Sequence, residues 1–195
     1  MAGERVRVTA GLPRVWYSLC VTTQTRISLE EFLAMPEIDE RRLELIDGEV
    51  YEKVSPRWGH GRIAIQIGAL LDAVGFASVE PRALIEGSAN RGPSSPLPDI
   101  AFYRNNPPGD DDWMTRPPAV AVEILSLGQS RAAMRAKVDL YLAFGVESVW
   151  VVDLERESVD VYEGGTRRTL SGDEAIESPA APGFRVTVSK LFERK

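Results

Sequence analysis

The sequence is poor in two residue types that build reactive sites, because it contains one cysteine, Cys20, and one histidine, His60. A single cysteine cannot form a disulfide within the chain, which favours a reducing compartment. A single histidine excludes a metal centre built from several histidines. Long apolar runs are also absent, since none approaches the roughly 20 residues that a membrane-spanning helix needs. We therefore expect a cytoplasmic protein without a membrane partner.

Positive charge is not in excess either. Lysine and arginine number 23 against 29 aspartates and glutamates, which gives a formal net charge of -6. This balance provides no overall attraction to nucleic acid, so any such contact must use a local basic patch. The chain is 44% hydrophobic and 27% charged, a composition typical of a folded domain and unlike that of a disordered chain.

The 195 residues are enough for one well-packed domain. Residues 1–25 show no hydrophobic period, whereas a capping-box pattern begins at Ser28. We expect residues 1–25 to be a poorly ordered N-terminal extension and residues 26–195 to form a single domain.

The spacing of apolar residues, with glycine and proline as breaks, predicts the order of the elements. Helices are expected at residues 28–35, 60–74 and 129–144, and a hairpin is expected at residues 42–54 around Asp47-Gly48. One or two strands are expected within residues 76–88, and further strands at residues 98–103, 119–126, 148–154 and 158–164, with a surface loop at residues 105–118. The strand, helix and strand between residues 119 and 153 require a crossover and hence a parallel pair. The fold class is α/β with a mixed sheet.

Three acidic residues lie in stretches that otherwise have the composition of strands. Asp99 begins "PDIAFY", Glu123 lies inside "VAVEIL", and Glu44 is flanked by leucines in the hairpin. An ionised carboxylate in a buried strand costs free energy unless it has a partner or a use. For any single acid, an arginine partner or a loop cap is the commoner explanation. If they converge, Asp99, Glu123 and the backbone carbonyl of Ile124 supply hard oxygen ligands that suit Mg²⁺ or Mn²⁺.

These acids stand in a pattern that resembles known nucleases. A "PD" dipeptide, followed by "ExL" in a hydrophobic strand and then by a helix, is similar to the PD-(D/E)XK nuclease superfamily. Closer still is the resemblance to the Uma-two family of restriction-endonuclease-like proteins, a domain of unknown function. It rests on the ordered stretches "SLEEFLAMPEIDERRLELIDGEVYE", "PLPDIAFYR", "AVEILS", "KVDLYLAFGVESVWVVD" and "PGFRVTVSKLF". The resemblance implies a restriction-endonuclease-like core, with a central mixed β-sheet flanked by helices, and metal-dependent hydrolysis of phosphodiester bonds.

The resemblance also implies a site made of Asp99, Glu123 and a lysine, with Glu44 as an additional acid. The chain departs from the superfamily pattern, because Leu125 stands where the superfamily lysine belongs. Lys137 is the candidate replacement, since it borders the apolar stripe of the expected helix and its stem is long enough to reach the strand end. A lysine that extends to solvent from the edge of an amphipathic helix explains the same position equally well.

Two functions agree with these residues. The first is a Mg²⁺- or Mn²⁺-dependent endonuclease acting on DNA, and because cleavage of both strands of a duplex needs two sites, a homodimer is one arrangement that the sequence allows. The second is a catalytically weakened nuclease-fold protein that serves as an interaction module. His60 is interpreted as a surface or helix-start residue, and reach into the site from the start of its helix is the less favoured alternative. Phosphate contacts in the first function are expected from Arg57, Arg62, Arg82, Arg91, Arg104, Arg131 and Arg135.

Overall fold

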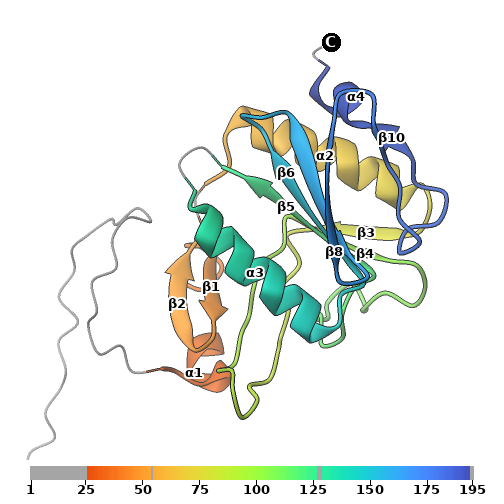
Figure 1. Cartoon of the computed structure of the whole chain (residues 1–195). Coiled ribbons are helices and arrows are strands. Elements are labelled where there is room, and N and C mark those ends of the chain that lie inside the picture. Colours follow the sequence, from red (N-terminus) through yellow and green to blue (C-terminus); the bar gives the residue numbers. More distant parts are fainter. Residues whose placement is uncertain (1–25, 54, 127–128, 194–195) are drawn as a thin grey trace, which may run out of the picture.

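The computed structural model describes residues 26–53, 55–126 and 129–193, so the predicted N-terminal extension lies outside the described residues. A six-stranded sheet is made of β3 (Phe76–Val79), β4 (Ile100–Tyr103), β5 (Val120–Leu125), β6 (Ser148–Asp153), β7 (Ser158–Glu163) and β8 (Thr166–Ser171). The strands lie in this order across the sheet (Figure 1). β5 and β6 run parallel, and the other neighbouring pairs run antiparallel. The mixed sheet and the predicted parallel pair are confirmed.

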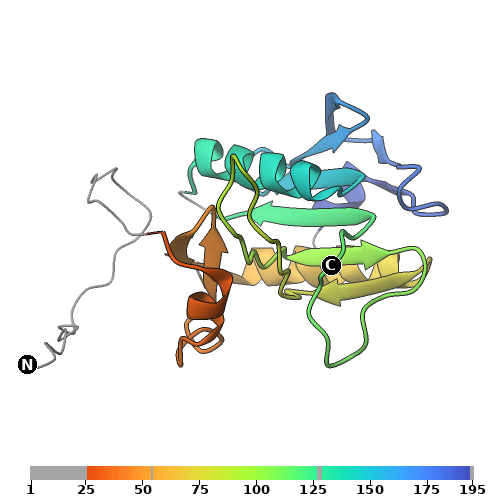
Figure 2. The same ribbon diagram turned by 90° about the horizontal axis from the view of Figure 1, so that it is seen from below.

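Helices cover both faces of this sheet (Figure 2). Helix α3 (Arg131–Phe144) makes the crossover between β5 and β6 and packs Met134 and Val138 onto one face. Helix α2 (Trp58–Asp72) and the short α4 (Val188–Phe192) cover the opposite face, where the core holds Ile63, Ile67, Leu71, Ile100, Phe102, Val122 and Leu191. The predicted α/β fold, a central mixed sheet flanked by helices, is therefore confirmed.

The alternation of side chains along β5 determines the face on which its acid lies. Val122 and Ile124 belong to the core beneath α2, whereas Ala121 belongs to the core beneath α3. Glu123 lies between Val122 and Ile124 in the strand and therefore points to the α3 side. Asp99 directly precedes β4, whose residue Ile100 pairs with Val122. Both acids are thus at neighbouring strands in the centre of the sheet.

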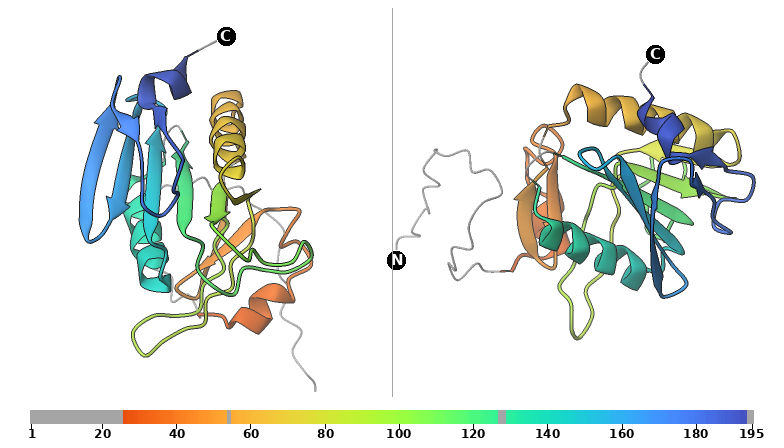
Figure 3. Two further views of the ribbon diagram at one scale, coloured as in Figure 1. Left: turned by 90° about the vertical axis from the view of Figure 1, so that its right-hand side faces the viewer. Right: turned by 45° about the horizontal axis from the view of Figure 1, so that its top comes forward.

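A separate two-stranded hairpin lies beside the sheet, near the start of α3 (Figure 3). It consists of β1 (Leu43–Ile46) and β2 (Glu49–Glu52) and follows α1 (Leu29–Leu33). Asp47 and Gly48 turn the chain with φ values of 53° and 81°, the conformation that favours this dipeptide in a hairpin. Leu45 and Ser95 exchange backbone hydrogen bonds of 3.2 and 2.7 Å, which join the hairpin to the segment that leads into β4.

The predicted strand at residues 76–88 is shorter than expected. β3 ends at Val79, because Glu80 takes a positive φ of 52° and Pro81 has no N–H to donate. The following residues form only isolated bridges, among them that of Ala83 with Met114. Met114 belongs to the predicted loop at residues 105–118, and it is buried.

The elements after residue 164 were not anticipated from the sequence. Edge strand β8 exposes nearly all of its side chains and therefore lacks the apolar alternation that predicts a strand. Two-residue strands β9 (Ala175–Ile176) and β10 (Val186–Thr187) pair with each other and lead into α4. No helix in the described ranges has the length and apolar character required to traverse a lipid bilayer.

Helix ends agree with the prediction at α3 and differ from it at α2. Gly145 caps α3 with a φ of 106°, as its position predicts. The C-cap of α2 is Ala73 in right-handed conformation, so α2 ends before the predicted residue 74 and Gly75 does not cap it. Gly75 is instead placed where the backbone approaches β4: a Cβ added there lies 2.5 Å from the Phe102 ring and 2.8 Å from the Tyr103 carbonyl oxygen.

We expect Gly75→Ala to lower the free energy of unfolding by about 1–3 kcal/mol, because the added methyl group overlaps a buried ring and a backbone oxygen. Gly61→Ala is the matched control, since a Cβ at Gly61 in α2 meets no atom within 4 Å. Alanine is the better helix former and should stabilise that position by about 0.5–1 kcal/mol. Urea unfolding of both variants measures the difference, and equal effects at the two glycines would contradict the packing argument.

Candidate active site

The Asp99 carboxylate is buried and held from three directions. Its Oδ1 atom lies 2.6 Å from Nζ of Lys53, the residue that follows β2. Its Oδ2 atom lies 3.1 Å from Nε2 of His60, in the first turn of α2. The same Oδ2 accepts a 2.6 Å hydrogen bond from the backbone N–H of Ile124 in β5. Hairpin, helix and sheet therefore meet at one carboxylate.

A second buried set joins the hairpin to α3. Nζ of Lys137 lies 2.7 Å from Oε1 of Glu123 and 2.9 Å from Oε1 of Glu44. The Tyr141 hydroxyl donates to the same Glu123 oxygen at 2.6 Å, and the backbone N–H of Leu97 donates to Glu44 at 2.7 Å. Lys137 thus bridges an acid of the hairpin and an acid of the sheet.

These two sets are adjacent in the chain and in space. Ile124, which donates to Asp99, directly follows Glu123, and Lys53 also donates to the carbonyl of Leu97 at 2.7 Å. We call Glu44, Lys53, Asp99, Glu123 and Lys137 the acid–lysine cluster. Its members are buried or nearly so, with Asp99 and Glu123 each 1% exposed. Charged groups this deep need the partners that they have here.

The surroundings shift the pKa values of the cluster in opposite directions. Burial opposes ionisation of Asp99, but the charge of Lys53 and the contact with His60 outweigh it and hold the pKa of Asp99 below its usual range. For Glu123, burial exceeds the attraction of Lys137, so its pKa is raised. Burial also disfavours the charge on Lys137, yet the attraction of Glu123 and Glu44 is larger and raises the pKa of that lysine. Glu123 is therefore the carboxyl group in which protonation is favoured by burial.

Charge in the cluster does not balance when all groups are ionised. Three carboxylates, those of Glu44, Asp99 and Glu123, face two ammonium groups, those of Lys53 and Lys137. A proton on Glu123 or an added cation neutralises the remaining negative charge. Neither Asp99 nor Glu123 has an arginine among the partners that the structure gives them.

The sequence predicted four of the side chains that meet here: Glu44, Asp99, Glu123 and Lys137. The Ile124 contact is made through its N–H, on Asp99, whereas the sequence analysis considered its carbonyl. Lys53 was not predicted from the sequence. His60 lies in the first turn of α2, as expected, but it is buried and reaches Asp99, which was the less favoured alternative. His60 had a usable signal, because Ile63 and Ile67 follow it at helical spacing on the same buried face.

Lys137 lies within the buried face of α3. The sequence predicted a position at the border of the apolar stripe of this helix. Leu142 is 38% exposed, whereas Lys137 and Tyr141 are buried, so the buried face of α3 turns toward Lys137 and Tyr141. Lys53 carried no comparable signal, since a lysine at the end of a hairpin strand is ordinarily solvated.

Four of the arginines expected to contact phosphate form ion pairs within the chain, namely Arg82 with Asp39, Arg104 with Glu147, Arg131 with Asp153 and Arg135 with Asp139. Arg82 is buried and also donates to the Leu43 carbonyl at 3.0 Å. It therefore braces the hairpin instead of presenting its charge to a ligand.

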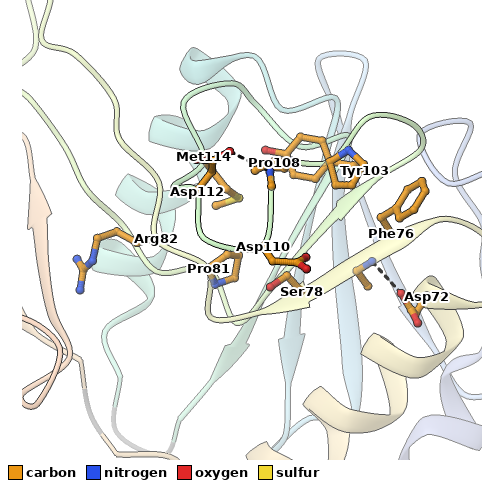
Figure 4. A pocket seen from close by; sticks show the side chains of 13 residues that line it. Asp72, Phe76, Ser78, Pro81, Arg82, Tyr103, Pro108, Asp110, Asp112 and Met114 are labelled. Atoms are coloured by element: carbon orange, nitrogen blue, oxygen red, sulfur yellow. Dashed lines mark hydrogen bonds between the residues drawn. The ribbon is translucent and has the colours of Figure 1, made fainter.

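A surface hollow beside β3 contains no member of the acid–lysine cluster (Figure 4). It is lined by Phe76 and Ser78 of β3 and by the loop that carries Asp110 and Asp112. Asp112 accepts a hydrogen bond from the N–H of Gly109 at 3.2 Å, so this acid shapes its own loop. The hollow is a feature of the loop and is distinct from the buried acids.

We expect Lys137→Met to lower the free energy of unfolding by about 3–5 kcal/mol, because it leaves two buried carboxylates without their shared cation. The double variant Glu44→Gln with Lys137→Met removes one charge of each sign, and glutamine keeps an oxygen for the N–H of Leu97. It should recover part of that loss. Urea unfolding compares the two proteins, and an equal loss in both would show that charge balance is not what Lys137 provides.

Comparisons with known proteins agree with the fold. The Uma2 family, described as "Putative restriction endonuclease", matches residues 29–189 and so includes the whole acid–lysine cluster. The fold is similar to the crystal structure of a protein from Anabaena variabilis described as "a putative nuclease belonging to DUF820", with a TM-score of 0.74 and 24% identity over 85% of this chain and 97% of that chain. No curated protein matches the chain significantly. The chain belongs to the Uma2 family, as its ordered motifs predicted.

Proposed function

We propose that the protein is a metal-dependent endonuclease that hydrolyses phosphodiester bonds of nucleic acid, with DNA as its substrate. The observation that carries the proposal is the contact of Lys137 with Glu123, 2.7 Å apart and next to Asp99. A lysine from α3 thereby stands beside the strand acids although Leu125 occupies the usual lysine position. Membership of a family described as restriction endonucleases supports the same reading.

The donor chemistry of the cluster fits a hard divalent cation. Asp99 and Glu123 would hold it, because carboxylate oxygens suit Mg²⁺ and Mn²⁺ and the cluster contains three carboxyl groups but only two ammonium groups. Among the described residues, no three His, Cys, Asp or Glu side chains gather as a metal site. Two carboxylates are nevertheless a common set for Mg²⁺, which keeps water and substrate phosphate as further ligands. Such a cation supplies Lewis-acid polarisation of the phosphoryl group.

The side chains of the protein would divide the remaining work. Lys137 has a permanent positive charge in this site, so it is suited to orient the attacking water and to neutralise the negative charge that develops on phosphate. Lys53 and His60 fix the Asp99 carboxylate from two sides, and the Tyr141 hydroxyl fixes Glu123. These three are positioning residues, since they act through the acids.

A second function is favoured by one observation, the closure of the cluster. With Asp99 and Glu123 each 1% exposed, a phosphate gains access to this closed arrangement only if an ammonium group exchanges a carboxylate for a phosphate oxygen. A catalytically weakened protein that keeps the cluster as a structural ion-pair network, and serves as an interaction module, needs no such exchange. The two functions differ in whether hydrolysis depends on the acids.

We expect the wild-type protein to cleave DNA internally with Mg²⁺ or Mn²⁺, and Asp99→Asn or Glu123→Gln to lower the rate by at least about a hundredfold, the scale of losing one charged group from such a site. The charge-matched double variant of Glu44 and Lys137 should be similarly slow while folded. Asp153→Asn is the control, since Asp153 is a buried acid at the end of neighbouring β6, outside the cluster. Single-stranded DNA, duplex DNA and RNA are assayed in parallel by gel. No cleavage under any of these conditions would support the interaction module.

Metal binding is measurable without turnover. We expect Mg²⁺ or Mn²⁺ to stabilise the wild-type protein, by about 2.7 kcal/mol at a concentration one hundred times the Kd. Asp99→Asn should lose most of this stabilisation, because asparagine keeps the shape of the aspartate side chain but lacks the charge of the proposed metal ligand. Thermal unfolding with and without metal gives the difference. A metal-induced shift in Asp99→Asn as large as that of the wild type would place the cation elsewhere.

A further inference from the structure

The outer face of α2 carries apolar side chains that the core does not use. Trp58 is 89% exposed and Ile65, two turns later, is 72% exposed. Together with Arg62, Gln66, Lys190 and Glu193, they line a groove between α2 and the C-terminal segment around α4. A tryptophan that stays in water loses the favourable free energy of burying its large ring. An exposed tryptophan beside an exposed isoleucine is therefore typical of a binding surface.

Positive charge gathers at the same groove. Most arginines that the structure describes are paired with carboxylates, whereas Arg57, Arg62 and Lys190 have no acid partner within 4 Å in the described chain. Arg62 donates instead to the carbonyl oxygens of Leu191 and Glu193, at 3.1 and 3.2 Å. Neutral acceptors hold its guanidinium in place and leave its charge uncompensated. Glu193 also lines the groove, so Arg62 and Lys190 face one acid there, and Arg57 directly precedes Trp58. A protein with a net charge of -6 thus keeps a small local excess of positive charge at this position.

This groove adjoins the acid–lysine cluster. Trp58 and His60 lie in the same first turn of α2, and Nε2 of His60 contacts Asp99. Residues two positions apart in a helix point to nearly opposite sides, so His60 faces the cluster while Trp58 faces outward. The two sides are separated by about the 10 Å width of a helix. A chain of nucleotides with one phosphate near Asp99 therefore reaches the groove within a few nucleotides.

We propose that this groove binds a single strand of nucleic acid, with a base stacked on Trp58 and phosphates beside Arg57, Arg62 and Lys190. The inference rests on the proposed nuclease function and adds a substrate class, nucleic acid with unpaired bases. Exposed aromatic rings interleaved with cations are the arrangement that binds single strands without regard to sequence. In a duplex, the bases are already stacked and paired, so the face of Trp58 has no base to contact.

The test measures binding in the presence of EDTA, so that no hydrolysis occurs. A fluorescently labelled single-stranded oligonucleotide and the duplex of the same length are titrated with full-length protein by anisotropy. Trp58→Ala should weaken single-strand binding about 5- to 100-fold, the effect of losing one base-stacking contact, and should change duplex binding far less. Trp113→Ala is the matched control, because Trp113 is 51% exposed on the loop at residues 105–118 and should leave both affinities unchanged.

A second variant examines the phosphate contacts separately. Lys190→Gln should reduce the slope of log K against log salt by about 0.7, the value for one phosphate contact with a single strand. The inference would be overturned by any of three results: the Trp58→Ala variant binds single strands as tightly as the wild type, the wild type prefers the duplex, or it binds neither. So would concentration-dependent dimerisation that Trp58→Ala abolishes, since a second copy then covers the groove.

The outcomes separate this inference from the nuclease proposal. If the protein binds single strands through Trp58 but cleaves no nucleic acid, the inference about the groove stands and the nuclease proposal fails. If cleavage depends on Asp99 and Glu123 but single-strand affinity does not depend on Trp58, the nuclease proposal stands and the inference about the groove fails.

Discussion

The ammonium group of Lys137, shared between Glu44 and Glu123, is the constraint on which the arrangement of this molecule depends. A buried ion costs several kcal/mol in desolvation unless its partners are well placed. Here one partner belongs to the hairpin, one to the central sheet, and the lysine itself to α3. The cost is offset only when all three elements occupy their final positions. A polar cluster of this kind links the correct docking of the hairpin to the charge balance of the core.

The parts of the fold that local chemistry determines were predictable from the sequence. Asp47-Gly48 requires positive φ at both residues and so specifies the hairpin, and Gly145 ends α3 for the same reason. The end of strand β3 had one signal in the sequence, Pro81, whereas the positive φ at Glu80 had none. Strand β8 was missed since it lies at the exposed edge, where hydrogen bonds to β7 form the strand without an apolar pattern.

For the candidate site, the same distinction holds. Glu44, Asp99 and Glu123 were recognisable because acids inside apolar strands are costly without a partner. Lys137 was recognisable because family resemblance required a lysine that Leu125 does not supply. Lys53 and Tyr141 become members of the site only through tertiary contacts, and neither has an unusual local environment in the sequence. The proposed hydrolysis requires an ammonium group beside the strand acids, and here Lys137 brings that group to them from α3.

Docking of the hairpin has a consequence for hydrogen exchange and partial unfolding. The hairpin is not part of the six-stranded sheet, and it meets the rest of the chain through the Leu45–Ser95 backbone pair, the bond from the N–H of Gly48 to the Pro93 carbonyl, and the side chains of Glu44, Lys53 and Arg82. An element outside the main sheet is where opening below the global transition is expected. Its opening withdraws Glu44 and Lys53 together and leaves Asp99, Glu123 and Lys137 in place, so a local fluctuation converts a sealed cluster into an accessible triad.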